Sequence, residues 1–192
     1  MLKELRPALV VFAALTVVTG AGYPALVTLI GRVAFSMQVE GSVIERDGKP
    51  AGSRLLGQPF SSPQYFWSRP SATAPQPYSG AASSGSNLGP TNPALKTAVA
   101  ARIAALRVVD PDNNGPVPVD LVTASASGLD PHISVAAAQF QVNRVARVRN
   151  LMPGAVAALV REHTEAPTFG AFGEARVNVL ELNLALDGDA AR

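Results

Sequence analysis

The feature that most constrains this chain is an uncharged apolar stretch near its N-terminus, residues 7–31. It reads PALVVFAALTVVTGAGYPALVTLIG. About 20 helical residues cross the roughly 30 Å hydrocarbon core of a bilayer, and in lipid a helix lets a single segment satisfy its own backbone polar groups. Gly20 and Pro24 would weaken a helix in water, but membrane helices tolerate such residues. We therefore predict one transmembrane helix over residues 7–34.

Two alternatives to a spanning helix are a cleaved secretory signal and a buried helix of a soluble domain. A signal has an apolar core of only about 7–15 residues, and 25 uncharged residues are long for a core helix. Lys3 and Arg6 precede the stretch, whereas Arg32 alone follows it closely. Because positive charge tends to stay cytoplasmic, we expect residues 1–6 in the cytoplasm and residues 35–192 on the opposite side of the membrane.

Composition restricts what residues 35–192 can do. Their length suits a single domain with its own core. After the helix, the number of lysine and arginine residues equals the number of aspartate and glutamate residues. The sequence pI of 9.3 therefore rests on a small excess of basic residues beside the helix, and the balanced charge of the domain argues against a nucleic-acid-binding face. The chain has no cysteine, which excludes disulfides, thiolate chemistry and cysteine-ligated zinc.

Local patterns after the helix alternate between strand and helix signals. Asp47-Gly48 interrupts two extended runs within residues 39–56, which predicts a hairpin. Asn92-Pro93 is a typical start for a helix over residues 94–108. Residues 119–123 read as a buried strand. The fold class expected is a mixed α/β (α+β) extracytoplasmic domain anchored by one N-terminal transmembrane helix.

The C-terminal third predicts two more helices and one ambiguous segment. One helix begins after Asp130 or Ser134 and ends at Asn150, and a short one starts at Pro153. Residues 177–186 are either a strand with alternating leucines or a helix with a capping box. In the helix that ends at Asn150, we expect valines and alanine inward (Val135, Ala138, Val142, Val145, Val148) and arginines outward (Arg144, Arg147, Arg149).

Residues 57–93 form a stretch rich in proline, glycine and serine that contains one charge and five of the eleven aromatic residues. Disordered segments are usually poor in aromatics, and long ordered loops are usually functional. We therefore predict an ordered loop that contacts a partner, with a loop packed only on its own core as the alternative. The candidate contact residues are Tyr65, Phe66, Trp67, Arg69, Tyr78 and Asn87.

No catalytic, cofactor or metal site is predicted. Ser125, Ser127, Asp130 and His132 could suggest a serine hydrolase, but a G-x-S-x-G elbow is missing and such residues are typical of turns and caps. The glycine- and serine-rich residues 83–92 resemble a phosphate-binding loop without its lysine. The two histidines lack metal-ligand spacing, and the apolar helix has no carboxylate to mark an ion path.

Several longer motifs together resemble the C subunit of the bacterial Kdp potassium-transporting P-type ATPase. The match runs from LRPAL near the start, through TG-x-G-YP in the helix, almost to the C-terminus. The other motifs are GSRLLGQPF (52–60), YFWSRPSAT (65–73), GSNLGPTNP (85–93), VDLVTASASGLDPHIS (119–134) and VNVLELNLALD (177–187).

The resemblance implies a non-catalytic subunit of a four-subunit inner-membrane complex for high-affinity potassium uptake. In that family a channel-like subunit binds potassium, a P-type subunit hydrolyses ATP and a small single-span subunit lies alongside. The C subunit is needed for assembly and acts as a catalytic chaperone that raises ATP affinity. Because ATP is cytoplasmic, we expect that effect to reach the hydrolysing subunit through the membrane. The alternatives are an anchored periplasmic binding or interaction domain and, less favoured, the serine hydrolase.

Overall fold

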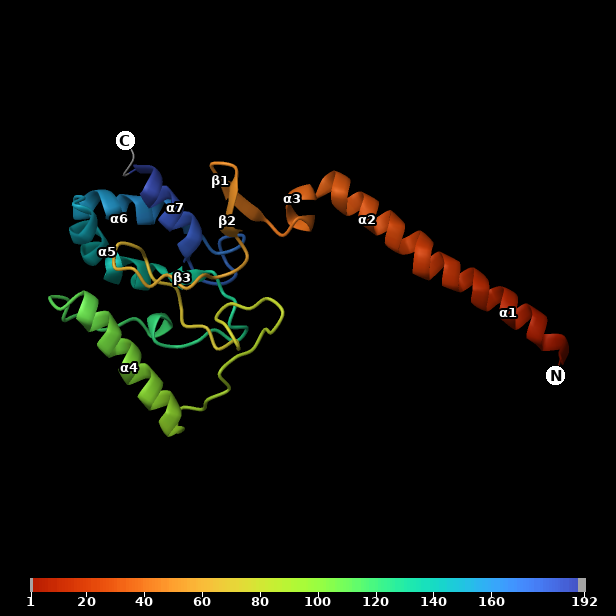
Figure 1. Cartoon of the computed structure of the whole chain (residues 1–192), viewed down its shortest axis with the longest axis horizontal. Helices are drawn as coiled ribbons and strands as arrows, with labels where there is room; N and C mark the ends of the chain where they lie inside the picture. The colour runs from red at the N-terminus through yellow and green to blue at the C-terminus, as the bar shows by residue number, and fades with distance from the viewer. Residues whose placement is uncertain (1, 190–192) are drawn as a thin grey trace. The chain divides into compact units, whose positions relative to one another are not determined.

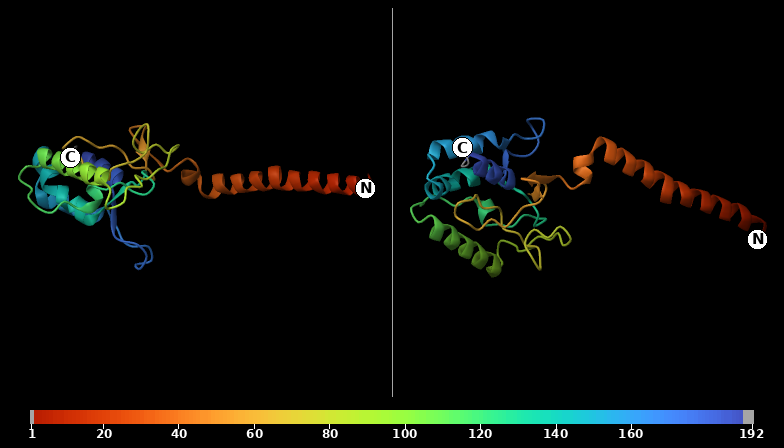
Figure 2. Two further views of the ribbon diagram at one scale, coloured as in Figure 1. Left: turned by 90° about the horizontal axis from the view of Figure 1, so that it is seen from below. Right: turned by 45° about the horizontal axis from the view of Figure 1, so that its top comes forward.

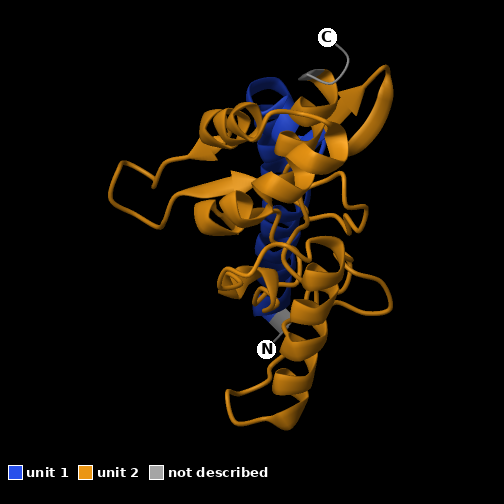
Figure 3. Cartoon of the chain, turned by 90° about the vertical axis from the view of Figure 1, so that its left-hand side faces the viewer, with its two compact units in different colours: residues 1–43 blue, residues 44–192 orange. Residues whose placement is uncertain are grey.

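The structure, a computed structural model, describes residues 2–189 (Figure 1). The chain divides after Val43 into two compact units, coloured separately in Figure 3. The first unit is helical apart from its end, and the second combines helices with two small sheets. The fold is therefore the predicted mixed α and β class with one apolar N-terminal helix.

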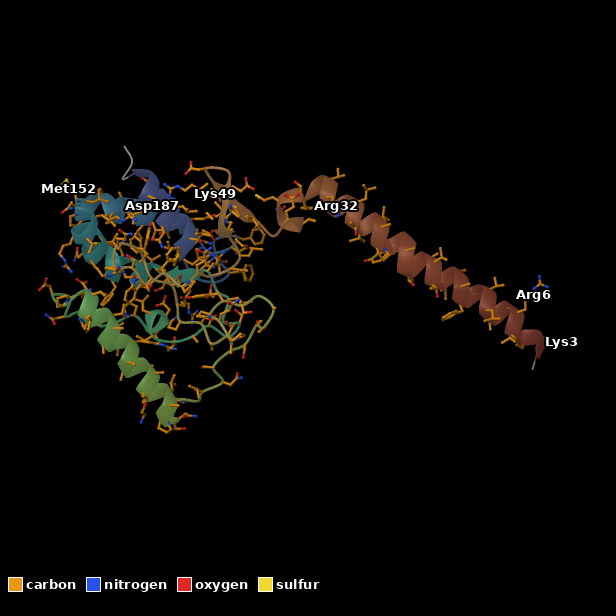
Figure 4. The ribbon with its side chains drawn as sticks, viewed as in Figure 1. Lys3, Arg6, Arg32, Lys49, Met152 and Asp187 are labelled. Atoms are coloured by element: carbon orange, nitrogen blue, oxygen red, sulfur yellow. The ribbon has the colours of Figure 1, made fainter. Side chains whose placement is uncertain are left out.

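The first unit is dominated by a long helix that consists of α1 (Leu2–Val17), a π-helical turn (Val18–Gly22) and α2 (Tyr23–Ala34). Within its part Lys3–Ala34, the most apolar window of 18 residues has a mean hydropathy of 1.9, and no share of that window is buried within the chain. Figure 4 shows Lys3 and Arg6 near one end of this helix and Arg32 near the other. The helix is long and apolar enough to cross a membrane, as predicted.

The π-helical turn lies where the sequence places two glycines and a proline. Pro24 has no N–H to donate to a carbonyl one turn earlier, which opens the regular hydrogen-bond pattern there. The Tyr23 N–H donates to the carbonyl of Val18 instead, closing a wider turn. After α2, Phe35 breaks the helix and a single further turn, α3 (Ser36–Val39), follows.

The predicted hairpin is present. β1 (Val43–Arg46) and β2 (Lys49–Ser53) pair in a two-stranded sheet. Asp47 and Gly48 between them have φ angles of 53° and 71°. Two successive positive φ values are what a type I′ turn requires, and Asp-Gly supplies them at low cost.

The second sheet has three short antiparallel strands and contributes Ile133 and Val177 to the core. In order they are β3 (His132–Ser134), β5 (Arg176–Asn178) and β4 (Thr164–Glu165). Ile133 lies opposite Val177, and both are buried. Three helices pack in sequence over this region: α5 (Val135–Arg149), α6 (Pro153–Glu162) and α7 (Val179–Asp189). Figure 2 shows them in cyan to blue, with α4 (Pro93–Val109) in green.

The capping predictions are confirmed at three helix starts. The Asn92 side chain accepts the N–H of Ala94 at 2.9 Å, so α4 begins as expected. Ser134, and not Asp130, caps α5: its Oγ accepts the N–H of Ala137 at 3.0 Å. The ambiguous residues 177–186 prove to be both structures in succession. Strand β5 ends at Asn178, whose side chain accepts the N–H of Glu181 at 3.2 Å to start α7.

The predicted strand over residues 119–123 is wrong. Val119–Leu121 is a short 3-10 turn, and Val119 is 69 % exposed. The Val119 carbonyl accepts the N–H groups of Val122 and Thr123. Because these backbone groups are satisfied within the turn, the segment does not need a neighbouring strand.

Three of the predicted directions on α5 are also wrong. The Arg149 side chain, expected to face solvent, is only 10 % exposed. Arg144, expected to face solvent, is only 1 % exposed, while Val148, expected in the core, is 42 % exposed. The reason is that the loop of residues 57–93 lies against this helix, and its carbonyls accept hydrogen bonds from Arg144. A buried arginine needs such partners. The face of α5 that carries Arg144 is therefore covered by the loop and not by solvent.

Candidate functional site

The aromatic loop, residues 57–93, is held mainly by side chains from the helices rather than by a sheet. Asn183 of α7 accepts the Phe66 N–H at 2.9 Å and donates to the Phe66 carbonyl at 3.0 Å. Gln141 of α5 makes the same pair of bonds with Trp67, at 2.8 and 3.2 Å. Two buried amides thus satisfy the backbone of successive residues, as a neighbouring strand would.

Arg144 fixes the loop just before these residues. Its guanidinium donates to the carbonyls of Pro63 and Tyr65 and, at 2.6 Å, to the side chain of Gln141. It also lies 5.1 Å from the centroid of the Trp67 ring, within the range of a cation–π contact. Burial lowers the pKa of Arg144 to about 10, so the group remains charged at neutral pH. One buried cation therefore joins three consecutive parts of the loop to α5.

Tyr65 is held by a second arginine. Its ring lies 4.8 Å from the guanidinium of Arg149, and its hydroxyl donates to Asp187 at 3.1 Å. Asp187, labelled in Figure 4, also pairs with Arg149 at 2.6 Å and with Arg46 of the hairpin at 3.0 Å. A single carboxylate on α7 therefore links the loop, α5 and the hairpin.

The later part of the loop packs against the turn that precedes β3. Arg69 pairs with Asp130 at 3.1 Å, and the Tyr78 hydroxyl donates to the carbonyl of Arg69. Burial raises the pKa of Tyr78, so its phenol stays protonated and available as a donor. A Cβ on Gly57 would lie 2.4 Å from the Tyr78 ring and 2.7 Å from the Asp130 carbonyl. Only glycine fits where the chain passes between them.

The predicted contact residues occupy very different environments. The Phe66 ring is 0 % exposed and belongs to the domain's own core, so it offers no surface to a partner. Tyr65, Trp67, Arg69 and Tyr78 are half-buried. The last candidate, Asn87, is exposed with a φ of 52°. The contact role of the loop stays a prediction. In that role Phe66 would act only by holding its neighbours in place.

Three of these candidates, Trp67, Arg69 and Tyr78, line one cavity of about 240 Å³ between the loop and α4. Arg102 and Leu106 of α4 form its other side. The structure therefore gathers half of the predicted contact residues around a single hollow.

The serine, aspartate and histidine cluster is built as a turn. Ser125 Oγ accepts the N–H of Gly128 at 3.0 Å, and Ser127 Oγ accepts the N–H of Leu129 at 3.1 Å. The His132 ring faces two carboxylates, at 3.3 Å from Asp130 and 4.0 Å from Glu165. These contacts support the turn interpretation of the serines, because each hydroxyl is engaged with a backbone N–H.

Sequence reasoning missed the side chains that hold the loop: Gln141, Arg144 and Asn183. Gln141 and Arg144 follow Ala137 at intervals of four and three residues and so share one face of α5, but nothing in the sequence pattern marks that face as covered by the loop. Asn183 stands alone among the leucines of α7. A polar residue at an otherwise apolar helix position is a reason to look for a backbone partner.

Asp130 gives a prediction for pH dependence. Its burial raises its pKa, but hydrogen bonds from the side chain and N–H of His132 and the charge of Arg69 outweigh that effect and lower the pKa below its ordinary 3.8. The folded state therefore binds this proton less readily than the unfolded state, and the stabilisation is present above pH 3.8 and lost as pH falls through the folded pKa. Asp130→Asn should cost about 1–2 kcal/mol at pH 7.

Urea unfolding of the wild-type chain and the Asp130→Asn variant, at pH 7 and pH 2.5, measures this effect. The difference between the two proteins should shrink at the lower pH. Asp112→Asn is the matched control, because that carboxylate is 84 % exposed. A constant difference at both pH values would contradict the assigned interactions of Asp130.

The architecture defines the class of this protein. One apolar helix long enough to span a membrane is followed by a small α and β domain with a fixed aromatic loop. Residues 5–188 match the family described as KdpC, the K+-transporting ATPase c chain. A relative from Ralstonia nicotianae is 66 % identical over 95 % of this chain and 89 % of its own length. Relatives from Sorangium cellulosum and Methylococcus capsulatus are 61 % and 59 % identical, over 98 % and 97 % of this chain and 99 % and 98 % of their own lengths.

All three relatives bear the name potassium-transporting ATPase KdpC subunit. The chain belongs to the KdpC family, whose members are non-catalytic subunits of the K+-transporting ATPase.

Proposed function

We propose that this chain assembles and stabilises a potassium uptake complex from within the bacterial inner membrane. Its partners would be a channel-like subunit that carries potassium, a P-type subunit that hydrolyses ATP and a small single-span subunit. The observation that carries the proposal is the helix Lys3–Ala34, whose charges lie only near its two ends and whose most apolar window is not buried within its own chain. Such a surface needs lipid or other helices. Small residues such as Ala13, Ala14, Gly20 and Ala21 suit close helix packing.

The proposed orientation places residues 1–6 in the cytoplasm and residues 35–192 in the periplasm. The support is the charge bias of Lys3 and Arg6 over Arg32. Protease added to cells with an opened outer membrane should digest the domain, whereas inside-out vesicles should protect it. The reverse pattern would overturn the orientation.

Co-purification tests the assembly role. Extraction of native membranes in mild detergent should recover this chain with the three partner subunits. Migration as a stable monomer would favour the alternative, an anchored periplasmic binding domain that acts alone.

The aromatic loop is the proposed contact surface, and Trp67→Ala should weaken assembly more than it destabilises the domain. Truncation of a central aromatic contact typically costs about 2 kcal/mol or more of binding, which is roughly a thirtyfold loss of affinity. The measurement pairs recovery of the complex with urea unfolding of the free chain. Phe172→Ala, a 70 % exposed aromatic outside the loop, is the control. Equal effects of Trp67→Ala on assembly and unfolding would make Trp67 an ordinary core residue.

For ATP affinity we propose an indirect effect, transmitted through the membrane helix and the channel-like subunit. The start of the glycine- and serine-rich segment, residues 83–85, supports this, because it is bonded to and packed against residues 126–127 of the domain. The Ser84 N–H donates to the Ser127 carbonyl at 2.9 Å, and a Cβ on Gly85 would lie 2.8 Å from the Ala126 carbonyl. Stoichiometric ATP binding by the purified chain alone would overturn the indirect mechanism.

A further inference from the structure

The cavity between the aromatic loop and α4 has the size and walls of a small binding site. Its volume is about 240 Å³. An apolar cavity of about 150 Å³ already accommodates benzene, whereas pockets for drug-sized ligands begin at about 300 Å³. Phe60, Trp67, Leu106 and Leu121 contribute apolar surface. The space therefore suits one ring-sized apolar group and is too small for a nucleotide.

The polar groups around this cavity are cationic. Arg69 and Arg102 both line it, and no aspartate or glutamate does. Arg69 is already paired with Asp130, but its buried Nε–H has no acceptor among the described residues. The cavity thus has two guanidinium groups and no compensating carboxylate in its wall.

Arg102 is the stronger of the two recognition groups. It donates to the carbonyl of Val122 at 2.7 Å, and no carboxylate within residues 3–188 forms an ion pair with it. Partial burial lowers its pKa, since the charge has lost water without gaining an anion. A partly desolvated guanidinium beside an apolar hollow favours an anion, and a carboxylate matches the planar fork of its donors.

We propose that this cavity binds a monocarboxylate with a ring-sized apolar body. The body would lie against Trp67 and Phe60, and the carboxylate would accept hydrogen bonds from Arg102. The same chemistry has two possible sources: a free small carboxylate, or an apolar residue next to a carboxylate on a neighbouring subunit. The binding experiment distinguishes them.

Phenylacetate is a suitable probe because it combines one ring with one carboxylate. Trp67 is the only tryptophan in the sequence, so its fluorescence reports directly on the cavity. Titration of the purified full-length chain in detergent should give saturable quenching or enhancement. Phenylacetamide, the neutral analogue of similar shape, should bind at least about tenfold more weakly, because it cannot form the charge-assisted bonds to Arg102.

Two variants and two matched controls locate the site on α4. Arg102→Gln should weaken phenylacetate binding by about tenfold or more, whereas Lys96→Gln, the same charge change at an exposed position, should not. Ala105→Leu should fill the cavity and block binding. Ala105 is exposed on the helix and leucine is a good helix former, so the variant should fold. Ala101→Leu, one turn earlier and outside the cavity lining, should bind as the wild type does.

The assembled complex separates the two sources. Binding to both the free chain and the complex supports a free carboxylate as the ligand. Binding to the free chain that disappears in the complex supports a neighbouring subunit as its source. Absence of binding to the free chain, equal affinity for phenylacetate and phenylacetamide, or unchanged binding by both Arg102→Gln and Ala105→Leu would overturn the proposal.

Discussion

Replacing Arg144 by alanine should lower the free energy of unfolding by about 3–5 kcal/mol, since the change leaves several buried acceptors without a donor. The guanidinium is 1 % exposed and donates to two loop carbonyls and to Gln141. Its removal also opens space beside the Trp67 ring. Urea unfolding of the full chain, followed by circular dichroism, measures the change.

Two further variants separate the hydrogen bonds of Arg144 from its volume and charge. Arg144→Met keeps much of the volume but leaves the same carbonyls unsatisfied, so it should cost nearly as much as alanine. Arg161→Ala removes an arginine from the exposed surface of α6 and should change stability by less than about 0.5 kcal/mol. A loss of less than about 1 kcal/mol for Arg144→Ala would show that the loop is not held by this residue.

Phe66→Ala should also cost about 3–5 kcal/mol, the typical range for removing a fully buried aromatic side chain. The ring is 0 % exposed and packs within the core that includes Leu182 and Leu186. The loss should also loosen the aromatic loop, so limited proteolysis should cut within residues 57–93 before it cuts the helices.

Phe169 provides the matched control for Phe66. It carries the same side chain at 92 % exposure, and Phe169→Ala should alter stability by less than about 0.5 kcal/mol. Similar losses for both variants would contradict the assignment of Phe66 as the anchor of the loop.

Much of the local structure was predictable because it depends on residues close in sequence. Asp47-Gly48 predicts the hairpin, and Asn92-Pro93 predicts the start of α4. The apolar run likewise predicts the long N-terminal helix. In each case the chemistry that determines the element lies within one or two turns of chain.

The features that could not be predicted depend either on a long-range contact or on a choice between two local structures that the same residues allow. Arg144 looks like a solvent-facing residue of α5 until the loop, about 80 residues earlier, covers it. The segment at Val119 has the apolar composition of a strand, but its backbone is satisfied in a turn and its strand pairing never forms. At residues 177–186, both predicted structures occur because Asn178 ends a strand and caps a helix at once. Only the outcome at Arg144 is decided by a partner far away in the sequence, whereas the turn at Val119 and the cap at Asn178 rest on local hydrogen bonds.

The two amides that hold the loop bind its peptide groups, because all four hydrogen bonds that they form with Phe66 and Trp67 involve main-chain atoms of the loop. The loop and the two amide residues therefore differ in how well they tolerate mutation. The loop can exchange side chains on its outer surface and keep its path. Gln141 and Asn183 have no such freedom: a glutamate or aspartate there would present an anion to a carbonyl oxygen and release the strand-like segment.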